Sequence, residues 1–405
     1  MVGAFTLVVG SNIGGYRLYL QRTNNPANAA TLAYGLTASG ILTGAPEFIV
    51  YAFNGAVGDH LLLRLAETSN DLNPELRVYR PDGTLLCDTF SYGSIAELNC
   101  LLDVVGTFTI LLGSNVGGYR LYLQRTNNPV YATPLAYGLT ASGILTGSPE
   151  FIVYTFSGVL GDHLLLRLLE TSNDLNPELR VYRPDGTLLC DTFSYGSIAE
   201  LNCLLDVVGT FMILLGSNVG GYRLYLQRTN NPAASSPITY SGTVTGSINA
   251  PEFTVLGFNG TAGDQLVLRI AETAGDLNPE LRVYRPDGIG LCNTFSYGSS
   301  AELNCLLDVS GPHTILVGSN TGDYTLHLQR SNNPIGASPI FSGNLRTGEI
   351  VRPSEMPSTS STALSATRSP CRSPRQTATS TQSCASIAPT ASDCAIPSAT
   401  AHRSS

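Results

Sequence analysis

The sequence contains no lysine and no tryptophan, and it has only five histidines. All 22 basic residues are arginine. The chain therefore has no lysine for a P-loop, a Schiff base or a general base. It also has no apolar run near the ~20 residues that a membrane-spanning helix needs, so we expect no membrane span.

The charge of the chain is mostly negative. Up to Pro334 it carries 16 arginines against 27 acidic residues, a net charge of −11. An acidic surface of this size argues against binding to nucleic acid or to an anionic membrane. Hydrophobic residues make up 43% of the chain, which is too apolar for a disordered protein.

One long repeat organises the sequence. The stretch "DLNPELRVYRPDG" begins at Asp71 and recurs 103 and then 102 residues later. A period this long corresponds to a whole domain, because solenoid repeats run ~20–50 residues. We place the copies at residues 33–129, 136–232 and 239–334.

The chain opens within another copy. Residues 3–26 match residues 106–129, so we interpret residues 1–26 as the C-terminal fragment of a preceding repeat. We therefore expect the chain to be part of a longer polypeptide, and the lack of a signal peptide carries no information about localisation.

Each copy contains eight short segments with strand character. In the first they are "SGILTG", "EFIVYAF", "DHLLLRLAE", "ELRVYR", "TLLCDTF", "AELNCLLD", "GTFTILLG" and "GYRLYLQR". Short strands separated by Gly, Pro, Asn and Asp turns predict an all-β fold of tandem antiparallel eight-stranded sandwiches, jelly-roll-like in size. Each copy is long enough to bury its own core, and we expect semi-stiff linkers between copies.

The motifs "F…G..GD.L.LR", "DLNPELRVYRPDG" and "GTFTILLGSNVGGYRLYL" together resemble the bacterial pre-peptidase C-terminal domain family. The resemblance covers all three copies and the opening fragment. It implies a β-sandwich accessory module on secreted bacterial proteins, often beside a peptidase. Some members of the family bind calcium, collagen or polysaccharide. This chain departs from the pattern by having two cysteines in each copy.

The acidic motif has two interpretations. As scaffold, it is a strand with Leu76 and Val78 in the core, followed by a Pro-Asp-Gly turn. As a site, its alternating oxygen ligands bind Ca²⁺, the only candidate cofactor. The candidate ligands are Asp71, Asn73, Asp82, Asp174, Asn176, Asp185, Asp276, Asn278 and Asp287.

Aromatic residues follow the fifth strand of each copy in "TFSYG". Phe90 and Tyr92 predict either an exposed platform for a sugar or a protein partner, or packing in the core. The ligand-binding candidates are Tyr92, Tyr195 and Tyr297. No Ser-His or Cys-His pairing recurs, so we predict no catalytic residue. We expect His60 to lie on a strand surface.

The cysteines of the repeats come in pairs thirteen residues apart. Metal sites usually place two cysteines two to four residues apart with further ligands. We therefore predict a disulfide across a hairpin in each copy, with a buried free thiol as the alternative. The pairs are Cys87/Cys100, Cys190/Cys203 and Cys292/Cys305.

Residues 335–405 end in a Ser/Thr/Ala/Pro-rich tail, for which we expect disorder. One interpretation is a mucin-like linker. The other is a fourth copy read in the wrong frame, because the codons of residues 378–401, shifted by one base, are compatible with "DLNPELRVYRPDGIGLCNTFSYG". The frame then changes between Thr347 and Ala366.

These patterns favour a non-catalytic array of sandwich modules, secreted or on the cell surface, that serves as spacer and binding region. Its expected partners are an extracellular protein or a polysaccharide. One alternative is an accessory region of a secreted peptidase or other hydrolase. Another is a calcium-dependent module that binds carbohydrate or protein.

Overall fold

The structure is a computed structural model. It describes residues 4–360, except for 11–12, 44–45, 70–71, 114, 173–174, 217, 342–343, 348, 350–353, 355 and 357–358. Most of the C-terminal tail, including residues 378–401 of the expected fourth copy, therefore lies outside the described residues, as do Asp71 and Asp174. Over the described ranges every regular element is a β-strand. The same ranges contain no helix long and apolar enough to cross a membrane.

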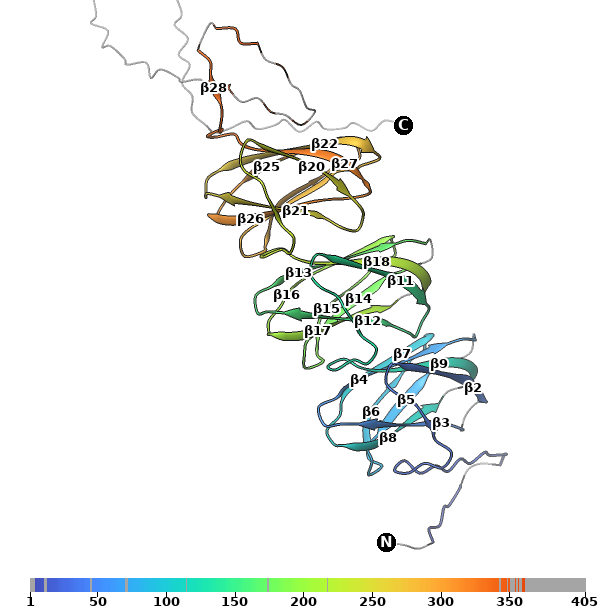
Figure 1. The fold of residues 1–405 in the computed structure, drawn as a ribbon. Helices are drawn as coiled ribbons and strands as arrows, with labels where there is room; N and C mark the ends of the chain where they lie inside the picture. The colour runs from blue at the N-terminus through green and yellow to red at the C-terminus, as the bar shows by residue number, and fades with distance from the viewer. Residues whose placement is uncertain are drawn as a thin grey trace, which may run out of the picture. The chain divides into compact units, whose positions relative to one another are not determined.

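The strands form three sandwiches in chain order, and Figure 1 shows the two stacked sheets of each. Sandwich 1 comprises β1 (Ala30–Thr31), β2 (Leu36–Thr43), β3 (Ile49–Gly55), β4 (His60–Glu67), β5 (Glu75–Tyr79), β6 (Leu85–Phe90), β7 (Ile95–Leu101), β8 (Gly106–Gly113) and β9 (Val116–Arg125). Sandwich 2 comprises β10 (Thr133–Pro134), β11 (Leu139–Thr146), β12 (Ile152–Gly158), β13 (His163–Glu170), β14 (Glu178–Tyr182), β15 (Leu188–Phe193), β16 (Ile198–Leu204), β17 (Gly209–Gly216) and β18 (Val219–Arg228).

Sandwich 3 comprises β19 (Ser236–Pro237), β20 (Gly242–Ile248), β21 (Thr254–Gly260), β22 (Gln265–Gly275), β23 (Glu280–Tyr284), β24 (Gly290–Phe295), β25 (Ser300–Leu306), β26 (Gly311–Gly318) and β27 (Gly322–Arg330). It is followed by the short pair β28 (Ser338–Pro339) and β29 (Thr359–Ser360). The eight predicted strands are present in each sandwich, and a ninth, two-residue strand precedes them.

The two sheets of a sandwich have four and five strands. In sandwich 1 the orders are β2-β9-β4-β7 and β1-β3-β8-β5-β6, and the other sandwiches repeat them. All pairings within these sheets are antiparallel except that of the short first strand, which pairs parallel with β3. We call the outer surfaces of the two sheets the four-strand face and the five-strand face.

Each sandwich encloses its own core. In sandwich 1 the core holds the inward residues of β4 and β9, among them Leu61, Leu63, Tyr119 and Leu121. The hydroxyl of Tyr119 lies 2.7 Å from that of Tyr51 on the opposite sheet, so this buried pair of polar groups is satisfied. Sandwiches 2 and 3 have equivalent cores, as the repeat predicts.

The Pro-Asp-Gly stretch is a turn between β5 and β6, as predicted. The Gly83 amide donates to the carbonyl of Arg80 at 2.9 Å, and Gly83 has a φ of +88°. Only glycine adopts this left-handed region without a steric penalty. Leu76 and Val78 of β5 are fully buried, so the scaffold prediction for these two residues is confirmed.

The cysteines of each pair are joined in a disulfide. The bridge does not cross a hairpin, which corrects the expected position. Cys87 lies on β6 of the five-strand sheet and Cys100 on β7 of the four-strand sheet, so the bond links the two sheets where the chain passes between them. It also places Cys100 in the core.

The same correction applies to the other two pairs. Cys190 on β15 is bonded to Cys203 on β16, and Cys292 on β24 to Cys305 on β25, again between the two sheets of one sandwich. Cys203 and Cys305 are buried in the cores of sandwiches 2 and 3, each 8% exposed. The alternative of a buried free thiol is therefore wrong for Cys100, Cys203 and Cys305, because these side chains are buried and also bonded. Burial and bonding occur together because the bridge passes through the interior between the sheets.

Loss of one bridge tests its contribution. The double substitution Cys292→Ser/Cys305→Ser removes the cross-link around thirteen residues, and we expect a loss of about 3 kcal/mol in the unfolding free energy of sandwich 3. Urea unfolding followed by tyrosine fluorescence measures it. Thiol labelling of the folded, untreated wild-type chain should modify none of the six paired cysteines; labelling of Cys292 or Cys305 would contradict the bond.

Candidate functional site

The four-strand face of one sandwich packs on the five-strand face of the next. Leu62 of β4 and Tyr122 of β9 lie in one buried apolar cluster with Phe151 and residues of β12, β14 and β17. The same arrangement recurs further along the chain, where Leu165 and Tyr225 pack with Phe253. Both sheets at a junction are therefore covered on both sides.

This double burial explains the apolar runs in the sequence. The "HLLLRL" segments of β4 and β13 contain successive buried leucines. Continuous apolar strands are typical of sheets covered on both faces. In a sheet with one solvent-exposed face, apolar and polar residues alternate along each strand. The equivalent β22 of sandwich 3 does alternate, with Val267 half-buried and Arg269 exposed.

A network of arginines and glutamates surrounds the apolar cluster of each junction. In the first, Arg64 donates to Glu178 at 2.9 Å, and Arg180 makes two hydrogen bonds to Glu97 at 2.6 and 3.1 Å. The guanidinium of Arg64 lies 4.7 Å from the ring centre of Phe151, within cation–π distance.

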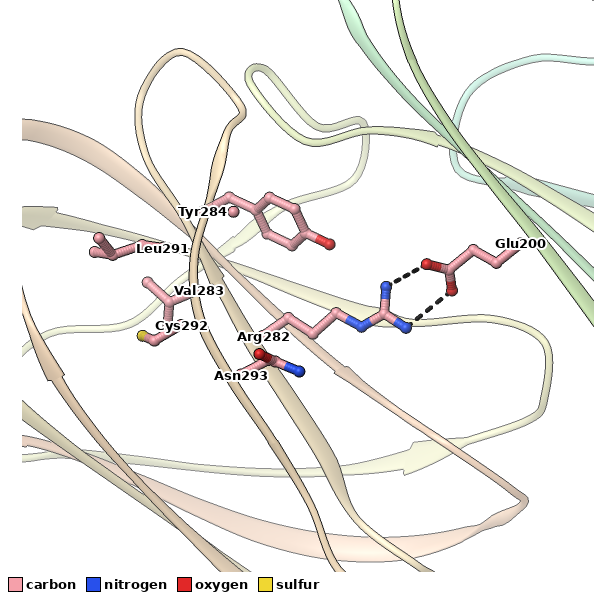
Figure 2. Close-up of a pocket in the computed structure, with 8 residues that line it drawn as sticks. Glu200, Arg282, Val283, Tyr284, Leu291, Cys292 and Asn293 are labelled. Atoms are coloured by element: carbon pink, nitrogen blue, oxygen red, sulfur yellow. Dashed lines mark hydrogen bonds and ion pairs between the residues drawn. The ribbon is translucent and has the colours of Figure 1, made fainter. Parts of the chain in front are cut away.

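The second junction reproduces this network. Arg167 donates to Glu280 at 3.0 Å, and Arg282 donates to Glu200 at 2.6 and 2.9 Å. Figure 2 shows Arg282 extended toward Glu200, with both hydrogen bonds drawn. Arg167 lies 4.7 Å from the ring centre of Phe253. Because each pair contains one residue from each sandwich, the network fixes one sandwich against the next.

The pKa shifts follow from this pairing. Burial acts to raise the pKa of Glu178, but Arg180 and Arg64 outweigh it and hold that pKa below its usual value. Burial likewise acts to raise the pKa of Glu200, but Arg282, with smaller contributions from Asn202 and Arg167, outweighs it and holds that pKa below its usual value. For Arg180 and Arg282, burial acts to lower the pKa, but the facing glutamates raise it above the usual range. All four groups are charged at neutral pH.

The Pro-Asp-Gly turn is the second contact at each junction. Thr126 donates through its hydroxyl to the carbonyl of Gly186 at 2.7 Å, and Thr229 donates to Gly288 at the same distance. A Cβ atom at Gly186 would lie 2.5 Å from the Cβ of His60. The glycine is thus required for the turn and for the close approach of the neighbouring sandwich.

A crevice opens beside each ion pair. Between sandwiches 2 and 3 it has a volume of about 430 Å³ and is lined by Glu200, Arg282, Tyr284 and Asn293, among others (Figure 2). The equivalent crevice between sandwiches 1 and 2 measures about 490 Å³ and is lined by Glu97, Arg180, Tyr182 and Asp191, among others. Glu200 and Arg282 are paired with each other, so these two charged groups hold the sandwiches together.

The structure keeps the asparagine and the turn aspartate of each candidate calcium site apart. Asn73, Asn176 and Asn278 precede β5, β14 and β23, whereas Asp82, Asp185 and Asp287 lie in the turns after those strands. A strand of five residues separates the two ends by roughly 16 Å or more.

The aspartates at the turns have local partners. Asp82 and Asp185 accept hydrogen bonds from the amides of Thr84 and Thr187, and Asp287 accepts one from the amide of Ile289. Over the ranges that the structure describes, no three His, Cys, Asp or Glu side chains gather into a group able to hold a metal ion. Asp276 is described, but Asp71 and Asp174 are not, and calcium binding stays a prediction.

The aromatic pair at the end of β6, and the equivalent pairs of the other two sandwiches, are exposed. Tyr92, Tyr195 and Tyr297 are each almost 90% exposed, and Phe90 is half exposed. Phe90 and Tyr92 meet edge to face with ring centres 4.8 Å apart, and the other two copies repeat this pair. Of the two interpretations of this motif, packing in the core is wrong for Phe90, and an exposed platform remains.

The junction residues were not recognised in the sequence. His60 lies partly buried against the Gly186 turn of the next sandwich. The sequence did not predict the contacts of Arg64, Glu97 and Phe151 across the junction, and the expectation of semi-stiff linkers overlooked them. The usable signal was the apolar run "LLLRL", which departs from the alternation of a sheet with one exposed face.

The chain matches no family model and no curated protein. The pre-peptidase C-terminal domain of collagenase from Bacillus anthracis is 18% identical, over 25% of this chain and 99% of that chain, with a TM-score of 0.22. The M60 catalytic domain with the CBM51-1 and CBM51-2 domains from Clostridium perfringens ZmpB is 11% identical, over 70% of this chain and 33% of that chain, with a TM-score of 0.17. A triple jelly-roll protein of an archaeal virus is 9% identical, over 70% of this chain and 82% of that chain, with a TM-score of 0.17. Likenesses at these scores carry no argument about function.

The ion pairs predict that arginines at equivalent positions of different sandwiches contribute differently to the free energy of unfolding. Arg282→Met leaves the largely buried Glu200 without its bidentate partner, so we expect a loss on the order of 3 kcal/mol in unfolding free energy. Arg77→Met is the matched control, because Arg77 occupies the same position in sandwich 1 but pairs with Glu75 of its own strand and is more exposed. Urea unfolding of both variants measures the difference; equal losses would contradict the role of the junction.

The lowered pKa of Glu178 and Glu200 predicts how the junctions respond to acid. A carboxylate whose pKa is lower in the folded state stabilises that state above its unfolded value, here close to 4.5, and the stabilisation is lost as the pH falls through the folded value. We expect the midpoint of thermal unfolding to fall as the pH drops below about 4.5. Glu200→Gln should show a smaller decrease over the same range, and an equal decrease would contradict the assignment.

Proposed function

We propose that this chain is a non-catalytic array of β-sandwich modules, secreted or on the cell surface, that acts as a spacer and as a binding region. The observation that carries the proposal is the junction, which is made twice with equivalent residues. A chain that only links independent modules needs no such contact. Here sandwich 2 uses both of its outer faces to hold its two neighbours, so the modules keep a defined relation to one another.

The disulfides support an extracellular setting. Each sandwich carries one bridge between its sheets, and such bonds persist in oxidising compartments and are rare in the cytosol. The acidic surface and the many neutral turns fit a protein that stays soluble outside the cell. The resemblance of the motifs to pre-peptidase C-terminal domains points in the same direction.

The exposed aromatic pairs are the proposed binding elements. Tyr92, Tyr195 and Tyr297 lie on equivalent turns and are the most exposed tyrosines of their sandwiches. An aromatic face offers a stacking surface to a sugar ring or to an apolar group of a protein. Three fixed copies also allow several weak contacts with one polymeric ligand, which raises the overall affinity without any new contact.

The binding role is tested by substituting the exposed tyrosines in the whole chain. We expect retention on an insoluble polysaccharide such as chitin or cellulose, or on fibrillar collagen. Any one of Tyr92→Ala, Tyr195→Ala and Tyr297→Ala should weaken this retention several-fold, and the triple variant should abolish it. Because these side chains are exposed, unfolding should be unchanged.

Pull-down with each matrix measures the retention, and Tyr131→Ala is the matched control, since Tyr131 is also exposed but lies between sandwiches 1 and 2. Retention of the triple variant at the wild-type level would remove the aromatic pairs from the proposal. Hydrolysis of either matrix by the purified chain would overturn the non-catalytic assignment.

A further inference from the structure

The four-strand face of sandwich 3 keeps the ionic residues of a junction although no further sandwich follows it in the described chain. Arg269 and Glu302 occupy the positions of Arg167 and Glu200, and both are exposed. Their register is also the same, because Arg269 pairs with Glu302 across β22 and β25 as Arg167 pairs with Glu200 across β13 and β16. An arginine and a glutamate are therefore positioned for a partner of the same kind.

Other positions of this face also keep their chemistry. Ser331 replaces Thr229 and retains the hydroxyl that binds the glycine turn of the next sandwich. Val267 and His327 replace Leu165 and Tyr225, so the apolar centre is smaller. Val267 is half-buried, whereas His327 is only 5% exposed, so the exposed part of this face is centred on Arg269 and Glu302.

The five-strand face of sandwich 1 carries the complementary residues. Phe48, Glu75 and Arg77 stand where Phe253, Glu280 and Arg282 form the second junction. The guanidinium of Arg77 lies 5.5 Å from the ring centre of Phe48, which reproduces the cation–π contact of Arg282 with Phe253. A groove of about 440 Å³ lined by Phe48, Glu75 and Phe90, among others, opens on this face.

In the structure the N-terminal segment lies on this face and imitates a neighbour. Arg17 pairs with Glu47 at 2.7 Å, Tyr19 packs against Phe48, and Thr23 donates to the carbonyl of Gly83 at 2.9 Å. These are the contacts that Arg120, Tyr122 and Thr126 make with sandwich 2. The segment has no core of its own, since Leu18 and Leu20 are 59% and 76% exposed.

We propose that the four-strand face of sandwich 3 binds the five-strand face of sandwich 1 in a second copy of this chain, through the junction that the chain already makes twice internally. Arg269 then meets Glu75, Glu302 meets Arg77, and Val267 packs on Phe48. The N-terminal segment competes for the same face and is displaced. The contact is head-to-tail, so an assembly of any length keeps one unpaired five-strand face at one end and one unpaired four-strand face at the other. Further copies can therefore add at both ends.

The proposal is tested by sedimentation velocity of the full chain over a range of concentrations. We expect concentration-dependent association beyond the dimer, weakened at high salt because part of it is ionic. A variant lacking residues 1–26 should associate at lower concentrations, since its five-strand face is uncovered. A chain that stays monomeric in both forms overturns the proposal.

Charge reversal identifies the two faces. Arg269→Glu/Glu302→Arg alters the face of sandwich 3, and Glu75→Arg/Arg77→Glu alters the face of sandwich 1. Each variant alone should associate at least about tenfold more weakly, because like charges meet. An equal mixture should recover association, because each reversed face then meets its reversed partner and each native face its native partner.

The mixture also controls for folding, since a misfolded variant cannot recover. Recovery is specific to a head-to-tail contact between these two faces. Association that neither variant weakens would assign self-association to another surface and overturn the proposal. A dimer that does not grow would also overturn it, because it indicates a symmetric contact between identical faces.

Discussion

The structure depends on one contact, in which an aromatic ring, two arginines and two glutamates close the space between consecutive sandwiches. Phe253 illustrates it, because Arg167 and Arg282 both lie over its ring while pairing with Glu280 and Glu200. Burying such charges is unfavourable unless every one is paired and hydrogen-bonded. The arrangement therefore tolerates one geometry, and its value lies in fixing the neighbouring sandwich rather than in added stability.

This contact gives a structural role to residues that would be solvent-exposed in an isolated sandwich. In "ELRVY" the leucine and the valine face the core, while Arg180 and Tyr182 face the preceding sandwich. The glycine of the Pro-Asp-Gly turn likewise closes a hairpin and receives a hydroxyl from the neighbour. The motif is repeated with little change because its inward and outward residues are both constrained.

The sequence predicted the fold well because strand boundaries depend on local patterns. Turn residues and alternation located all eight main strands, and the spacing of Cys292 and Cys305 predicted their bond. The site was predicted poorly, because the partners of Arg64 and Glu97 lie more than 80 residues away and no local pattern joins them. Expecting a hairpin disulfide had the same origin, since two consecutive strands need not belong to one sheet.

Comparison of two equivalent strands, β13 and β22, shows how burial of a face affects the residues on it. β13 is buried on both sides and reads as "LLLRL", whereas β22 has one uncovered side and reads as "LVLRI" with an exposed arginine. The arginine is retained although it has lost the buried environment that the equivalent residue has in sandwich 2. An isolated exposed arginine contributes little to stability. Its position opposite Glu302 is therefore better explained by a partner face than by the stability of sandwich 3 alone.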